Sequence, residues 1–90
     1  MNILFERSFA KDLKAITDAT TRSAIQATIQ DIKDKATPSE LTNCKKLHGY
    51  STLYRLRIGD YRLGMEFRED DNTMIIVRCL HRKEIYRYFP

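Results

Sequence analysis

The segment 53–67 alternates apolar and polar side chains on both sides of the dipeptide Gly59-Asp60. Successive side chains of a β-strand point to opposite faces of the sheet, so strict alternation gives one apolar and one polar face. A glycine followed by an aspartate between two such runs is typical of a tight turn. The pattern therefore predicts a β-hairpin with strands at 53–58 and 61–68, and this hairpin constrains the fold more than any other feature.

Three arginines share the polar face of this hairpin: Arg55, Arg57 and Arg62. If the turn has two residues, Ile58 pairs with Tyr61, and Arg57 then lies directly opposite Arg62. Like charges placed opposite each other destabilise a sheet. An anionic partner would remove that cost, so the face is a candidate anion-binding surface.

The first half of the chain predicts a short strand and two amphipathic helices. The strand is expected at Asn2–Phe5, Ser8 is the expected N-cap of the first helix, and Asp18 to Thr21 supplies a turn and the second cap. The apolar stripes are Phe9, Leu13 and Ile16 on the first helix and Ile25, Ile29, Ile32 and Ala36 on the second. The run Thr37-Pro38-Ser39 should end the second helix, and the two helices should pack as an αα-hairpin.

The strands that follow predict an α+β fold. A short extended piece is expected around Lys45 to Leu47, and a strand at 74–80 is apolar on both faces, which favours a position inside the sheet. Helices first and antiparallel strands afterwards indicate one small antiparallel sheet with the helical hairpin packed on one face. Residues 1–90 are expected to form a single domain.

Composition narrows the function classes. The chain has 90 residues and a net charge of +4, and the excess of Lys and Arg over Asp and Glu lies entirely in the second half. No apolar run approaches the ~20 residues of a membrane span, and no secretory signal is visible, so a soluble cytoplasmic protein without membrane contact is expected. Cys44 and Cys79 belong to no metal-binding pattern, no cofactor motif is present, and both thiols should be reduced.

The expected basic face extends beyond the hairpin. Arg78 and Arg82 of the last strand should join the three hairpin arginines, with Glu66 as the only counter-ion in reach. His81 alternates away at the strand end, and Tyr86 lies near the rim. Further candidate phosphate contacts are Lys45, Lys46 and Arg87. Guanidinium groups bind phosphate and aromatic rings can stack on unpaired bases, so the chemistry that these residues favour is a metal-independent reaction of a phosphodiester.

The residues of the second half resemble the RelE/ParE toxin superfamily of type II toxin–antitoxin modules. The resemblance is carried by Lys45-Lys46-Leu47-His48-Gly49, by the hairpin from Leu53 to Arg62, and by His81-Arg82-Lys83-Glu84-Ile85-Tyr86-Arg87. Phe9-Ala10-Lys11-Asp12-Leu13-Lys14 is similar to the start of the family's first helix. The ending looks more like the RelE branch, which cleaves messenger RNA in the ribosomal A site. The resemblance implies a RelE-like, microbial-RNase-like fold, and as partners an antitoxin, the ribosome and mRNA.

The RelE-like pattern also implies roles for single residues. Arg55, Arg57 and Arg62 would surround the scissile phosphate, Arg82 or else His81 would donate toward the 5′ oxygen, and Tyr86 would orient a base. No strong general base can be named, and arginine is a poor one at neutral pH.

Two alternatives remain open from the sequence. A ParE-like chain would inhibit DNA gyrase through its helices without catalysis, and the arginine face would then be dispensable. A purely regulatory module would bind operator DNA together with its antitoxin, with strong salt dependence.

Overall fold

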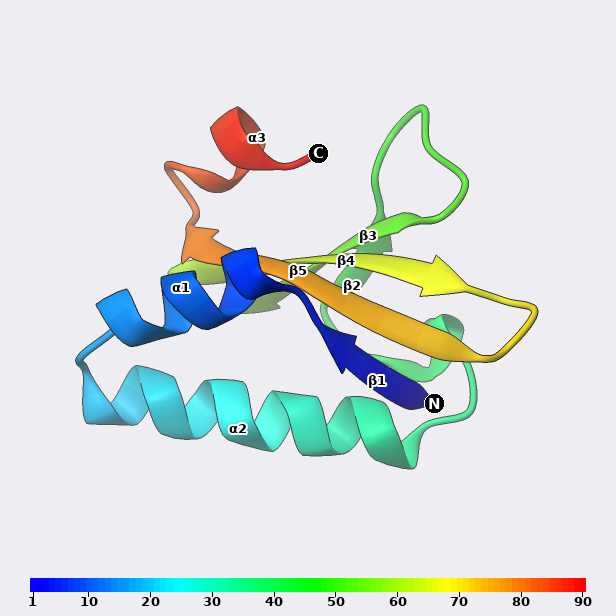
Figure 1. Ribbon diagram of the computed structural model, residues 1–90, viewed down its shortest axis with the longest axis horizontal. Coiled ribbons are helices and arrows are strands. Elements are labelled where there is room, and N and C mark those ends of the chain that lie inside the picture. The colour runs from blue at the N-terminus through cyan, green and yellow to red at the C-terminus, as the bar shows by residue number, and fades with distance from the viewer.

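The computed structural model covers residues 1–90 and contains one five-stranded sheet with helices on both sides. The elements are β1 (Asn2–Phe5), α1 (Arg7–Ala15), α2 (Ala19–Asp34), a 3₁₀ turn (Pro38–Glu40), β2 (Cys44–Lys46), β3 (Leu53–Ile58), β4 (Tyr61–Arg68), β5 (Thr73–His81) and α3 (Ile85–Tyr88). Figure 1 shows α2 crossing below the sheet and α3 lying above it. The α+β class is confirmed.

The sheet is mixed rather than wholly antiparallel. The strand order is β1-β5-β4-β3-β2, and β1 runs parallel to β5. The other three pairings are antiparallel, as expected. A parallel neighbour requires a long crossover, and here nearly the whole chain lies between β1 and β5. The expected central position of the last strand is confirmed, because β5 lies between β1 and β4.

The main core lies between the sheet and the two N-terminal helices. It comprises Phe9, Ile16, Ile25, Ile32, Leu41, Leu56, Ile58, Leu63, Met65, Met74, Ile76 and Cys79. The stripe residues Phe9, Ile25 and Ile32 all belong to it, so the predicted helix faces are confirmed. We call this side of the sheet the helix face and the other side the open face.

The start of α1 and the end of α2 differ in detail from the sequence expectation. Helix α1 begins at Arg7 with Glu6 as its N-cap, whereas the Ser8 hydroxyl donates to the carbonyl of Val77 on β5. Asp18 does cap α2, since its carboxylate accepts the backbone N–H of Thr21 at 2.8 Å. Helix α2 ends at Asp34, so Ala36 lies beyond it.

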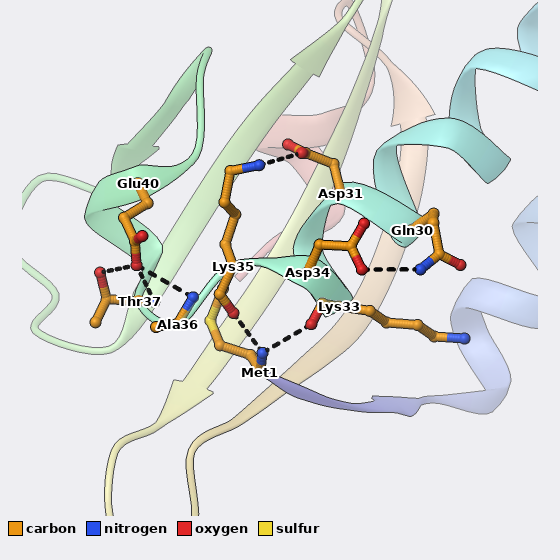
Figure 2. A network of polar contacts seen from close by, with 9 residues as sticks. All are labelled: Met1, Gln30, Asp31, Lys33, Asp34, Lys35, Ala36, Thr37 and Glu40. Carbon is orange, nitrogen blue, oxygen red and sulfur yellow. Dashed lines mark hydrogen bonds and ion pairs between the residues drawn. The ribbon is translucent and has the colours of Figure 1, made fainter.

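A polar network fastens the end of α2 to the start of β1 (Figure 2). The ammonium group of Met1 donates to the carbonyls of Lys33 and Lys35. Glu40 accepts the backbone N–H groups of Ala36 and Thr37, which holds the turn that follows the helix. The network satisfies carbonyls at a helix end that would otherwise lack partners.

Candidate functional site: a basic cleft on the open face

The hairpin has the predicted register. Ile58 pairs with Tyr61, so the turn has two residues, and Arg57 lies directly opposite Arg62. Gly59 has a φ of 56°, a left-handed conformation that glycine adopts without strain and that two-residue hairpin turns require. Two like charges therefore face each other across the strands.

A cleft on the open face gathers the basic side chains of β2, β3 and β4. Its volume is about 350 Å³, and it is lined by Asn43, Lys45, Arg55, Arg57 and Arg62. No carboxylate and no imidazole belongs to this lining, so four positive charges converge without a negative one. We call this site the arginine cleft.

Neutral groups orient the guanidinium groups of the arginine cleft. Arg62 Nη1 donates to the carbonyls of Gly59 at 2.8 Å and Tyr61 at 2.9 Å. Arg57 Nη2 donates to the side-chain oxygen of Asn43 at 3.1 Å. These bonds restrict the side chains and leave their charges uncompensated, which suits the binding of an anion.

Tyr86 lies beside the cleft, next to Arg55. The guanidinium carbon of Arg55 lies 5.9 Å from the centroid of the Tyr86 ring, within the range of a cation–π interaction. The Tyr86 side chain comes from α3 and is 61 % exposed. An exposed ring beside ordered guanidinium groups can stack on an unpaired base while the arginines hold a phosphate.

Arg78 was expected to join the hairpin arginines on the basic face, but its charge is paired with a carboxylate of α1. Its Nε lies 2.7 Å and its Nη2 2.9 Å from the two carboxylate oxygens of Asp12 on α1, and the same carboxylate accepts the backbone N–H of Cys79 at 3.0 Å. The hydrogen bonds to Asp12 raise the pKa of Arg78. The guanidinium carbon of Arg78 also lies 5.6 Å from the centroid of the Tyr88 ring. Arg78 therefore links α1, β5 and α3.

The end of β5 also departs from the expectation. The Nε of Arg82 lies 3.8 Å from a carboxylate oxygen of Asp60 in the hairpin turn, so Glu66 is not the only acidic group near the basic face. His81 pairs with Tyr61 on the helix face, where the two rings meet edge to face at 5.7 Å between centroids. Its Nδ1 accepts the backbone N–H of Lys83. His81 is thus turned away from the arginine cleft, as the alternation predicted.

The two lysines of β2 lie on opposite faces of the sheet. Lys45 pairs with Arg55 and lines the cleft, whereas Lys46 pairs with Tyr54 on the helix face and lies 5.7 Å from the centroid of that ring. Alternation along a strand forces this separation, so Lys46 does not line the arginine cleft, and its role as a phosphate contact stays a prediction. Arg87 on α3 is exposed and does not line the cleft.

Sequence reasoning missed Asn43, which lines the cleft, and Asp12, which binds Arg78. Asn43 has a φ of 58°, and its backbone carbonyl accepts the N–H of Arg57 at 2.9 Å while its side chain holds the guanidinium. Asparagine tolerates this left-handed conformation better than most residues, which was the available signal. Asp12 gave no local signal, because its partner lies 66 residues away.

Neither cysteine has the features of a nucleophile. Burial raises the pKa of the Cys44 thiol to about 11 and that of Cys79 to about 12. A thiol is reactive as its thiolate, so both groups are inert near neutral pH. No group of three or more His, Cys, Asp or Glu side chains has a spacing that could hold a metal ion, and no helix is long and apolar enough to cross a membrane.

Comparisons with known proteins show the family to which the chain belongs. Residues 3–86 match the family model described as "ParE toxin of type II toxin-antitoxin system, parDE". Toxin RelE3 of Methanocaldococcus jannaschii is 41 % identical to the chain over 91 residues, which covers 100 % of both sequences.

Solved structures extend the match to the fold. The crystal structure of a RelB–RelE antitoxin–toxin complex from Methanococcus jannaschii contains a chain 39 % identical to this one, with a TM-score of 0.79 and coverage of 97 % and 99 %. A chain of the archaeal RelE–RelB complex from Pyrococcus horikoshii OT3 shares the fold, with a TM-score of 0.74, 22 % identity and coverage of 90 % and 93 %. The chain therefore belongs to the RelE/ParE superfamily and is a toxin of a type II toxin–antitoxin system.

Proposed function

We propose that the chain is a ribosome-dependent endoribonuclease that cleaves mRNA in the ribosomal A site and thereby inhibits translation. The observation that carries the proposal is the arginine cleft, in which Lys45, Arg55, Arg57 and Arg62 converge without a carboxylate. A phosphodiester that gains negative charge during reaction is the ligand such a cleft favours most. The likeness to RelE toxins supports the same assignment.

The reaction needs no nucleophile from the protein. The 2′ oxygen of RNA attacks the adjacent phosphorus, the bond from phosphorus to the 5′ oxygen breaks, and the products are a 2′,3′-cyclic phosphate and a 5′-hydroxyl. The arginines of the cleft would stabilise the phosphorane between these steps. The repulsion between Arg57 and Arg62 is relieved most when that negative charge is greatest, so it favours the transition state over the ground state.

Two proton transfers complete the reaction. For the 5′ oxygen that leaves, Arg82 is the better of the two sequence candidates, since the His81 ring packs against Tyr61 and its Nδ1 is already occupied. The 2′ hydroxyl must lose a proton, and the lining of the cleft contains no carboxylate or imidazole to accept it. We therefore assign that acceptor to the ribosome, which would account for the proposed dependence on the ribosome.

The proposal includes a cognate antitoxin. The structures from Methanococcus jannaschii and Pyrococcus horikoshii are complexes of RelE with RelB. An antitoxin of this chain would cover the open face, and operator DNA would be bound only by the toxin–antitoxin complex.

Primer extension on translated mRNA tests the proposal. Wild-type protein should cut ribosome-bound transcripts and leave free transcripts intact, and Arg62→Ala should abolish the cuts. Arg68→Ala is the matched control, because Arg68 is an arginine of the same strand that pairs with Asp71 outside the cleft. Intact transcripts at toxin concentrations that saturate the ribosomes would reject the proposal.

A second candidate function is non-catalytic inhibition of DNA gyrase. It is favoured by the name of the matching family model and by a groove of about 240 Å³ between the first two helices, lined by Leu13, Arg22, Ile25, Gln26 and Ile29. This function predicts inhibition of supercoiling without ribosomes, undiminished in Arg62→Ala.

A further inference from the structure

Gly64 leaves a gap in the open face, and the ring of Phe89, the residue that follows α3, fills it. Gly64 pairs with Arg55 on β3 and with Arg78 on β5, so a side chain here would project between two arginines. A Cβ atom at Gly64 would lie 2.6 Å from Cγ, 2.7 Å from Cδ2 and 2.9 Å from Cδ1 of the Phe89 ring. Atoms do not approach that closely, so only glycine admits the ring in this position.

Phe89 and Ile85 anchor α3 at its two ends. Phe89 is 4 % exposed and Ile85 is 0 % exposed, although neither belongs to the main core on the helix face. The backbone N–H of Phe89 donates to the carbonyl of Ile85 at 2.8 Å, which closes the helical turn between them. A helix of only four residues is not stable alone, so its place depends on these anchors.

The two tyrosines between the anchors lie against arginines. Tyr86 and Tyr88 are 61 % and 51 % exposed, and their rings lie over Arg55 and Arg78 respectively. Neither tyrosine is held by burial of its own ring. Their positions therefore follow from where α3 is docked.

We propose that Gly64 and Phe89 form a lock that positions Tyr86 beside the arginine cleft. Both are positioning residues, which act on the RNA only through Tyr86. The inference rests on the proposed endoribonuclease function for its consequence in catalysis, while the lock itself can be measured without RNA.

Gly64→Ala tests the lock from the sheet side. The new methyl group would meet the root of the Phe89 ring, so the ring must leave its buried place and α3 loses one of its two anchors. Displacement of a substrate-positioning group by about 1 Å can reduce a rate by about 100-fold, so we expect a loss of about tenfold or more in the single-turnover rate of cleavage. The toxin concentration that half-saturates ribosomes should stay within about twofold of wild type, because Tyr86 is one of several contacts.

Double variants separate positioning from general damage. Gly64→Ala should have no further effect in a Tyr86→Ala background, because the lock acts through that ring. Phe89→Ala removes the anchor from the other side and should resemble Gly64→Ala in rate, and the two together should be no worse than either. Phe5→Ala is the matched control, since Phe5 is an exposed phenylalanine of β1 outside the cleft. Additive losses in these cycles would overturn the inference.

An NMR measurement decides the lock independently of RNA cleavage. The ring current of Tyr86 should shift the side-chain resonances of Arg55, and Tyr86→Ala defines the unshifted reference. In Gly64→Ala and Phe89→Ala these resonances should move toward that reference. The chemical shifts of the core residues should keep the values of the folded wild-type protein. If they keep their wild-type positions, the lock is refuted; if wild type shows the shift but cuts no mRNA, only the proposed function fails.

Discussion

Asp12→Ala is expected to destabilise the domain strongly, because Asp12 is a nearly buried carboxylate with three hydrogen bonds. Its side chain is 9 % exposed and that of Arg78 is 24 % exposed. Removal of Asp12 leaves the Arg78 charge without its carboxylate and the backbone N–H of Cys79 without an acceptor. The substitution therefore leaves partly buried polar groups without partners, which costs more than the loss of a contact at the surface.

The magnitude follows from burial. Removal of one partner from a buried ion pair costs about 3–5 kcal/mol, and the partial exposure of Arg78 favours the lower end, about 3 kcal/mol. A domain of this size is stable by roughly 5–13 kcal/mol, so the change removes a large fraction of the total. Each kcal/mol corresponds to about 4–8 °C in Tm for such a domain, which gives a fall of roughly 12–24 °C.

Chemical denaturation followed by circular dichroism measures the free energy of unfolding directly. Asp71→Ala is the control, because its partner Arg68 also lies 2.9 Å away but the two side chains are 52 % and 46 % exposed. That exposed pair should contribute less than about 1 kcal/mol. Asp12→Asn should fall between the two, since its amide oxygen can still accept the N–H of Cys79. Equal losses for Asp12→Ala and Asp71→Ala would refute the reasoning.

Three further predictions concern charge and burial. Arg57→Thr should remove the repulsion with Arg62 and raise the free energy of unfolding by about 0.2–1 kcal/mol in low salt, while abolishing mRNA cleavage; a gain of the same size in 1 M salt would argue against electrostatics. The Cys79 thiol, whose pKa burial raises to about 12, should resist iodoacetamide at pH 8 until the protein unfolds, as mass spectrometry would show. Hydrogen bonds from the side chain and backbone of Thr21 lower the pKa of Asp18 from 3.8, so this cap should stabilise the protein above that pH and lose its effect as the pH falls further. Acid unfolding of Asp18→Ala should accordingly show a weaker pH dependence below pH 3.8 than wild type does.

The register of the hairpin could be predicted because two local rules were sufficient. A side-chain period of two assigns each residue to a face, and a two-residue turn then fixes which residues face each other. The pairs Arg57 with Arg62 and Ile58 with Tyr61 follow without knowledge of the rest of the chain. The N-cap at Asp18 was predictable for the same reason, since capping is a contact within one helical turn.

The remaining features depend on contacts between distant segments. The parallel pairing of β1 with β5 and the ion pair of Asp12 with Arg78 join opposite ends of the chain. Helix α3 is too short to produce a helical period in the sequence. Its place depends on the gap at Gly64 that the Phe89 ring fills. A glycine within a strand indicates that another group packs closely there, but the sequence does not identify that group.

The sheet order has a consequence for synthesis of the chain. The first strand to leave the ribosome, β1, has its only sheet partner in β5, the last strand, and the helix that carries Tyr86 follows later still. A nascent chain can form α2 and the hairpin early, but it cannot complete the sheet or dock α3 until β5 and α3 have left the ribosome. If the ribosome is the target of this toxin, the fold itself delays activity until the segment that carries Tyr86 has left the ribosome.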